Sequence, residues 1–459
     1  MKKTLALIVC GALMLPFAGC SNNVSVSENT ESQTTSAVET EAAPAEGAAA
    51  DNSDDQFVSA YPAFAVTSES LDGNIWIEAC SNTEDGENAS PELSWEPVEG
   101  ATVLLDTVGK DGADIFFENL KYCLAGRSLD YVVVHHMEPD HSATLAEVLD
   151  ANADAKVIVN AKTLQFISQF FPEKDYSARA IVVKDGDELD LGSHKFKFVF
   201  APMVHWPEVM LSFDETEGTL FSADAFGSYG AINGSIFADG KNFETDLLSE
   251  ARRYYTNIVG KYGMQTIAAI NKAAQLDIKM ICPLHSYVWR KDIDKIINCY
   301  KTWGSYTPEV EGAFILTGSI YGHTANAAEV LMTELDKRGI DSVILDASAA
   351  DISDIIAAAF KYSHIVIATP TYNNNMYSPV EHAVRELAAH GLTARSFSVI
   401  ENGTWAPSAA KNLAPVLEGL KNCKITGETV TIKSSGNDAT RLGIESLAEA
   451  IENDIRNNK

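Results

Sequence analysis

Seven side chains of types that bind metal ions lie at or near the ends of apolar, strand-like segments. Four of them fall within residues 136–141, which read HMEPDH and follow the strand-like run 130–136. The other three each follow a later apolar run. In α/β proteins the ends of strands hold functional loops in fixed positions, so side chains from distant segments can converge there. The seven candidate ligands are His136, Glu138, Asp140, His141, His205, Asp224 and His285.

Each candidate also has a simpler interpretation. His and Asp at turns often cap helices or satisfy loop hydrogen bonds, and a lone histidine is more often structural than metal-binding. The combination weakens that alternative, because three carboxylates and four imidazoles all occur near strand ends. The carboxylates can offset most of the charge of two divalent cations, while neutral imidazoles fill the remaining protein positions.

A second set of loops could hold a flavin nucleotide. Residues 313–335 read as a strand, a short polar turn and a helix. Backbone amides, hydroxyls and a helix N-terminus can hold a monophosphate without Lys or Arg, whereas a triphosphate site would require a P-loop lysine. The pattern therefore suits FMN. The turn residues are Ser319, Ile320, Tyr321, Gly322, His323 and Thr324.

Two further loops, 368–379 and 401–407, follow the next apolar strands of this half. Flavodoxin-like folds hold their ligand at such strand ends, at the topological switch point. Tyr372 and Trp405 are aromatics on these loops, and we expect them to stack on the isoalloxazine ring. The alternative is that both are ordinary loop anchors.

The elements that must position these residues form two α/β halves. Short β-rich runs such as 101–108 and 195–202 alternate with turns up to about residue 304, and 244–276 has a helical pattern. After about residue 313, near-continuous apolar strands alternate with helical segments, which indicates a parallel sheet covered on both faces. The change of rhythm places the domain boundary at 303–312.

The whole pattern resembles the flavodiiron proteins, also called A-type flavoproteins. Their motif H-x-E-x-D-H, followed by His, Asp and His at long spacings, is matched with 63, 18 and 60 intervening residues. The resemblance covers about residues 60–455. It implies a metallo-β-lactamase-like αββα sandwich over 57–308, followed by a flavodoxin-like doubly wound parallel sheet over 309–459.

The resemblance also implies how two non-haem irons are held. Asp224 would bridge both irons; His136, Glu138 and His205 would complete one site, and Asp140, His141 and His285 the other. Zinc hydrolases of this fold generally have His where Glu138 stands, and a harder, anionic ligand favours iron over zinc.

Some residues depart from the family pattern or lie outside it. Ser286-Tyr287 stands where the family commonly has Gly-Pro. His135 adjoins the motif, but strand parity turns it away from His136. The stretch 77–100 would be either a lid or a solvated hairpin.

By the same resemblance, the phosphate loop and two ring-flanking loops of flavodoxin correspond to the three loops described above. The expected contacts beyond the phosphate turn are Thr369, Pro370, Thr371, Tyr372, Asn373, Asn402, Gly403, Thr404 and Trp405.

The function implied is an oxidoreductase in which FMN passes electrons to a diiron site that reduces O2 to water, NO to nitrous oxide, or both. An external donor, rubredoxin-like or a flavin reductase, would supply the electrons, and the family works as head-to-tail dimers. Two alternatives remain open: a zinc hydrolase with a flavodoxin-like half that no longer functions, and a tethered flavoprotein that only carries electrons.

The negative net charge of the chain limits which macromolecules and membranes it could bind. The chain has 459 residues and a formal net charge of −30. Nucleic-acid binding requires a cationic surface, and charge alone would not attract this chain to an anionic bilayer. Residues 1–20 carry +2, residues 21–56 carry −8, and the remainder carries −24.

The first 20 residues have the pattern of an export signal, with a basic start, an apolar run and Ala18-Gly19 before Cys20. This resembles a lipobox, with Phe17 where Leu is usual, and predicts lipidation of Cys20. The polar, acidic segment 21–56 is predicted to be a flexible tether. We therefore expect an extracytoplasmic, membrane-anchored lipoprotein, or a cytoplasmic protein if the leader is not functional.

The seven cysteines argue against other modules. Cys10 and Cys20 lie in the leader, and the other five are scattered without a C-x-x-C pair. This spacing argues against a disulfide scaffold, a zinc ribbon and a built-in rubredoxin module.

Overall fold

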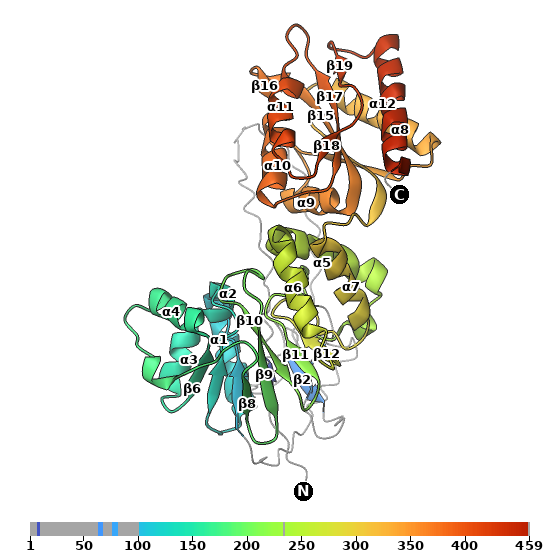
Figure 1. The fold of residues 1–459 in the computed structure, drawn as a ribbon. Helices are drawn as coiled ribbons and strands as arrows, with labels where there is room; N and C mark the ends of the chain where they lie inside the picture. Colours follow the sequence, from blue (N-terminus) through green and yellow to red (C-terminus); the bar gives the residue numbers. More distant parts are fainter. Residues whose placement is uncertain (1–6, 10–62, 68–75, 81–100, 233–234, 458–459) are drawn as a thin grey trace, which may run out of the picture.

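The computed structural model describes residues 7–9, 63–67, 76–80, 101–232 and 235–457 (Figure 1). The tether 21–56, Cys20 and most of the stretch 77–100 lie outside these ranges. Within the described part of the chain, no helix has the length and apolar character needed to cross a membrane, and Cys123, Cys282, Cys299 and Cys423 are free thiols.

The N-terminal domain begins with a parallel sheet in the order β1-β4-β5-β6-β7. Its strands are β1 (Leu7–Val9), β4 (Val103–Leu105), β5 (Tyr131–Val133), β6 (Lys156–Val159) and β7 (Ala180–Val182). Helices α1 (Ala113–Leu124), α3 (Leu145–Ala151) and α4 (Ala161–Phe170) belong to this half of the domain. Strand β1, which pairs with β4, falls within the segment predicted to be an export leader.

A second sheet packs against the first, in the order β12-β11-β10-β9-β8. Its strands are β8 (Glu188–Asp190), β9 (Lys195–Phe200), β10 (Met210–Asp214), β11 (Thr219–Phe221) and β12 (Met280–Cys282). Val103 and Val133 of the first sheet share a buried cluster with Phe196, Phe198 and Phe221 of the second. This apolar layer between two sheets makes the domain an αββα sandwich.

The outer layer of the second sheet departs from the single helix-like stretch predicted over 244–276. The chain there forms η4 (Phe243–Leu247), α5 (Leu248–Tyr254), η5 (Tyr255–Val259), η6 (Gly260–Tyr262) and α6 (Gly263–Ala273). Two glycines lie at the breaks, and Gly263 packs so closely that an added Cβ would lie 2.3 Å from the Gly304 carbonyl oxygen. Close packing against α7 (Ile293–Gly304) therefore requires a residue without a side chain at position 263.

Two strands, β2 (Ala63–Thr67) and β3 (Trp76–Cys80), form an antiparallel pair. Only residues 77–80 of the stretch considered as a lid or hairpin are therefore described, and they lie in β3.

The C-terminal domain has a parallel sheet with β14, β13, β15 and β17 side by side and β18 and β19 both beside β17. The strands are β13 (Val310–Thr317), β14 (Ser342–Asp346), β15 (Tyr362–Tyr372), β17 (Ser396–Asn402), β18 (Lys424–Ile425) and β19 (Val430–Ile432). The short β16 (Asn375–Met376) pairs antiparallel with the end of β15. The chain starts in the middle of the sheet, adds β14 on one side and then continues on the other, which is the flavodoxin order.

Helices cover both faces of this sheet (Figure 1). On one face, α8 (His323–Lys337) and α12 (Asp438–Asn457) share a buried cluster with β13 and β15. On the other, α9 (Ile352–Lys361), α10 (Ser378–Ala389) and α11 (Ala409–Glu418) form a second cluster. The fold class predicted from the sequence, an αββα sandwich followed by a doubly wound sheet, is confirmed.

The two domains contact each other through α5, η5 and α9. Arg252 on α5 forms a bidentate pair with Glu309, with 2.8 Å between Nη2 and Oε2. Glu309 also accepts a hydrogen bond from the Trp303 indole at 2.7 Å. These contacts attach the segment between α7 and β13 to the body of the first domain.

Candidate metal centre and flavin-binding face

The structure brings all seven candidate ligands together as two adjoining groups. His136, Glu138, His205 and Asp224 form the first group, and Asp140, His141 and His285 form the second. Each ligand lies shortly after a strand. His136 and Glu138 lie in the loop after β5, Asp140 and His141 lie in the short helix α2 (Pro139–Ser142) that follows it, and the remaining three ligands follow β9, β11 and β12. The second sheet and the first therefore both contribute to one site.

Asp224 lies between the two groups. Its Oδ2 is 3.0 Å from Nε2 of His205, whereas its Oδ1 is 3.2 Å from Nε2 of His141 and 3.4 Å from Nε2 of His285. The carboxylate is 1% exposed. This is the placement of a carboxylate that bridges two metal ions, with one oxygen directed to each.

The remaining ligand atoms converge in the same way. In the first group, Oε2 of Glu138 lies 3.2 Å from Nε2 of His136 and 2.9 Å from Nε2 of His205. In the second, Nε2 of His141 and Nε2 of His285 lie 2.9 Å apart. Imidazole nitrogens directed at one another inside a buried site suit a shared cation.

The electrostatics of the cluster favour cations. Burial by itself lowers the pKa of His136, yet the carboxylates of Asp224, Glu138 and Glu208 raise it to about 10. Burial would raise the pKa of Glu138, but hydrogen bonds from His136 and His205 lower it to about 2. A site that stabilises positive charge so strongly has the donor set expected for divalent metal ions, and these residues fit a diiron centre.

Glu208 is a functional residue that the sequence interpretation missed. Its Oε1 accepts hydrogen bonds from Nδ1 of His136 at 2.8 Å and from the backbone amide of Met137 at 3.0 Å. The residue is 1% exposed. An acidic residue within the apolar run APMVHWPEVM was the available signal, because a buried carboxylate requires a specific partner.

His135 lies outside both ligand groups, as its strand parity predicted. Its Nδ1 is 2.5 Å from Oδ2 of Asp106, and its Nε2 is 2.7 Å from the Ser212 hydroxyl. Asp106 also accepts the backbone amide of His135 at 2.7 Å. The three residues join β4, β5 and β10 beneath the metal ligands.

A hollow of 380 Å³ opens beside the first group. Its walls are mostly apolar and include Phe170, Met203, Trp206 and Tyr262, with His205 also on its wall. Phe170 and Trp206 stack with 6.5 Å between ring centroids. The hollow therefore offers an apolar contact surface next to a metal ligand.

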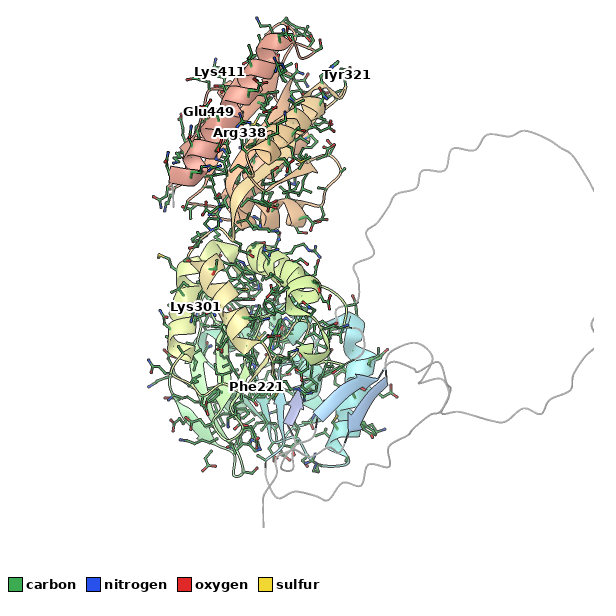
Figure 2. The ribbon with its side chains drawn as sticks, turned by 90° about the vertical axis from the view of Figure 1, so that its right-hand side faces the viewer. Phe221, Lys301, Tyr321, Arg338, Lys411 and Glu449 are labelled. Atoms are coloured by element: carbon green, nitrogen blue, oxygen red, sulfur yellow. The ribbon has the colours of Figure 1, made fainter. Side chains whose placement is uncertain are left out.

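The predicted flavin loops gather at one end of the C-terminal domain. The phosphate turn leads into α8. The loop predicted at 368–379 begins later than expected, because β15 continues to Tyr372, and the loop predicted at 401–407 begins after Asn402, the last residue of β17. Tyr321 and Trp405 are 88% and 89% exposed, and Tyr372 is 46% exposed. Figure 2 shows Tyr321 at the end of the domain opposite the metal domain. The exposed rings could therefore contact a planar ligand, and that ligand would lie far from the metal site of its own chain.

Several predicted flavin residues also have structural contacts. The Thr371 hydroxyl accepts the backbone amides of Ser408 and Ala409, at 2.9 and 3.2 Å, where α11 begins. The Thr369 hydroxyl accepts the amide of Tyr377 at 3.3 Å. A side chain at position 403 would clash with the loop, because a Cβ added to Gly403 would lie 2.8 Å from Cα of Pro407.

A fourth loop, 433–437, was not predicted to belong to this face. The Asn402 amide donates to the carbonyl of Ser434 at 2.9 Å and accepts its backbone amide at 3.2 Å. The Ser434 hydroxyl also donates to that of Thr404 at 2.9 Å. Asn402 and Thr404 therefore order this loop, and no local motif indicates that pairing.

The phosphate turn and the remaining predicted residues differ in their exposure. Thr324 is buried at the start of α8, while Gly322 and His323 are exposed. The Gly322 amide donates to the Ser319 hydroxyl at 3.1 Å, which closes the turn. Ile320 is 43% exposed. Pro370 is half-buried and Asn373 is exposed.

Comparison with known proteins agrees with this arrangement. The family model described as "ODP family beta lactamase" matches residues 97–286. A nitric oxide reductase from Moorella thermoacetica is 28% identical over 353 residues, which are 75% of this chain and 86% of the relative.

Two solved structures have the same fold. Rubredoxin oxygen:oxidoreductase from Desulfovibrio gigas superimposes with a TM-score of 0.72 and 25% identity, over 78% of this chain and 88% of the other. A mutant flavo di-iron protein from Thermotoga maritima gives a TM-score of 0.70 and 24% identity over the same shares. In its two ligand groups, its flavodoxin-like domain and their order along the chain, the protein is similar to the flavodiiron proteins.

Proposed function

We propose that this chain is an FMN- and diiron-dependent oxidoreductase that reduces O2 to water, NO to nitrous oxide, or both, with electrons from an external donor protein. The observation that carries the proposal is the split carboxylate of Asp224, whose two oxygens face two complete sets of ligands. A hydrolytic zinc site with His in place of Glu138 would have a less anionic donor set.

The residues of the chain have distinct tasks in this function. One iron would be held by His136, Glu138 and His205. The other would be held by Asp140, His141 and His285, and both would be bound by Asp224. The irons and the flavin, when bound, supply the electron transfer to a diatomic gas. The side chains of Glu138 and Asp140 are 35% and 39% exposed, so small molecules can approach the site from their side.

The placement of the flavin loops supports a head-to-tail homodimer. The loops lie at the end of the C-terminal domain that is opposite the metal domain of the same chain (Figures 1 and 2). Electron transfer between FMN and iron is fast only over a short separation. The apolar hollow beside His205 offers a contact surface for the flavin-bearing end of a second chain.

The kind of electron donor is proposed from the names of two similar proteins. The name of the Desulfovibrio gigas protein pairs it with rubredoxin and oxygen, and that of the Moorella thermoacetica protein with nitric oxide. A rubredoxin-like protein or a flavin reductase would serve this chain. Because the chain carries a net charge of −30, a donor with a basic patch would dock most readily at low salt.

We further propose that the protein is exported and held at a membrane through lipidated Cys20. Support comes from the leader pattern and from the acidic, polar segment 21–56. Radiolabelled fatty acid incorporation into wild type and its absence from Cys20→Ala would support this location; equal labelling of both would contradict it.

The function is tested by anaerobic reduction of the purified full chain, followed by addition of O2 or NO in separate experiments. We expect two irons and one FMN per chain, with gas consumed at the expense of the donor. Zinc in place of iron, together with an absence of flavin, would contradict the proposal. A protein loaded with FMN and iron that consumes neither gas would contradict it equally.

A further inference from the structure

The two metal positions differ in what stands behind their histidine ligands. At the first position, His136 has a buried carboxylate on its far nitrogen, with 2.8 Å between Nδ1 and Oε1 of Glu208. At the second position, Nδ1 of His141 and Nδ1 of His285 are buried without a hydrogen-bond partner among the described residues. The ligand types are otherwise alike, since each position has two imidazoles, one carboxylate of its own and one oxygen of Asp224.

Glu208 is itself held in place. Its backbone carbonyl accepts the Asn160 side-chain amide at 2.6 Å, and its Oε1 also accepts the Met137 amide at 3.0 Å. The side chains of Glu208 and His136 are both 0% exposed. Burial therefore shields the contact between Glu208 and His136 from solvent.

A carboxylate that accepts the Nδ1 proton has two consequences for the ligand. With a metal ion bound it would keep the ring proton on Nδ1, so that Nε2, the nitrogen beside Glu138 and Asp224, is the one left to bind the metal. It also makes the imidazole a stronger donor, because partial negative charge is transferred to the ring. Loss of such an outer partner typically weakens metal binding about 10- to 100-fold. His141 and His285 have no equivalent carboxylate among the described residues.

We propose that Glu208 makes the two metal positions unequal, so that the ion held by His136, Glu138 and His205 is bound more tightly than the ion held by Asp140, His141 and His285. Glu208 is a positioning residue, since it acts through His136 and does not contact the metal. The inference rests on the proposed dimetal function and adds an order of affinity to it.

The test uses the iron-loaded full chain, dialysed anaerobically against a graded series of a ferrous chelator, with iron and protein measured at each step. Wild type is expected to lose its two irons in separate steps, with midpoints at least about 10-fold apart in free iron. In Glu208→Gln the tighter step moves by about 10- to 100-fold toward the weaker one, which itself shifts little.

Variants of the ligands show which metal position loses its iron in which step. Asp140→Asn is expected to retain one iron that leaves at the tighter midpoint, and His205→Asn one that leaves at the weaker midpoint. The matched control is Asp214→Asn, because Asp214, at the end of β10, forms a similarly buried pair with His194, at 2.6 Å, outside both ligand groups. That variant should keep two well-separated steps.

Three results would overturn the inference while leaving the dimetal site intact: a single step in wild type, an unchanged separation in Glu208→Gln, or the same merging in Asp214→Asn. Reversal of the step assignment in the ligand variants would also overturn it. Fewer than two irons per loaded wild-type chain would instead contradict the proposed function, so the two failures are distinguishable.

Discussion

Oδ2 of Asp224 lies 3.0 Å from Nε2 of His205, while the other oxygen of the same carboxylate faces the opposite ligand group. The loop after β11 thus supplies one side chain that faces both metal positions. Burial of this carboxylate at 1% exposure is tolerable only because imidazole nitrogens surround it.

Asp224→Asn should therefore disturb both metal positions, because an amide offers one neutral oxygen where two anionic ones are needed. We expect less than one iron per chain after loading, against two in wild type, measured by elemental analysis of the purified protein. Asp140→Asn is the comparison, since it removes a ligand from one position only. Retention of two irons in Asp224→Asn would show that the carboxylate does not bridge.

Trp405→Ala should weaken FMN binding. The indole is 89% exposed on the loop after β17, and the loss of a stacking partner costs about 0.5 to 1.5 kcal/mol, or about 2- to 10-fold in Kd. The measurement is a flavin fluorescence titration of the full chain after removal of FMN. Tyr122→Ala is the control, because this tyrosine is also exposed, at 53%, but lies on α1 of the metal domain. An equal effect of both variants would argue against stacking on Trp405.

Glu309→Ala should destabilise the junction between the domains. The substitution leaves Arg252, which is 8% exposed, without its bidentate partner and removes the acceptor of the Trp303 indole. Breaking a buried ion pair from one side costs about 3 kcal/mol in the free energy of unfolding, which urea denaturation measures.

The exposed pair Lys110–Glu147 supplies the comparison for that result, since its side chains are 59% and 47% exposed. Glu147→Ala should change the free energy of unfolding by about 0 to 1 kcal/mol. Similar values for the two variants would mean that the interdomain pair behaves as a surface contact.

Buried His364 should make the C-terminal domain lose stability in mild acid. Burial lowers the pKa of His364 below its usual value, and the nearby Asp454 offsets this only in part. Below about pH 6.5 the unfolded chain takes up a proton that the folded chain resists. The contribution is therefore complete above that pH and is lost as the pH falls toward the folded-state pKa.

We expect the Tm of wild type to fall between pH 7 and 5, and to fall less steeply in His364→Gln, measured by calorimetry. Nε2 of His364 is 2.8 Å from the Ser398 hydroxyl, a contact that glutamine can retain. His390→Gln, at a partly exposed histidine, should keep the wild-type slope. Identical slopes for wild type and His364→Gln would show that another group controls the acid response.

Much of the architecture was predictable because it follows from local patterns. Alternating and continuous apolar runs distinguish the sandwich from the parallel sheet, since side-chain burial repeats with the period of each element. The helix-like stretch 244–276 was only partly right. Helical periodicity persists across Gly260 and Gly263, whereas the structure divides the stretch into η4, α5, η5, η6 and α6, with Gly263 packed against Gly304 of α7.

The sequence by itself determined which side chains could bind metal and flavin, because residue type and strand-end position are local properties. The tertiary structure decided how they are shared: Asp224 faces both ligand groups, Glu208 supports His136 alone, and Thr371 caps α11. It also placed the flavin loops away from the metal site of the same chain (Figure 1). These relationships depend on contacts between residues distant in sequence, and such contacts are set by the packing of whole sheets and domains.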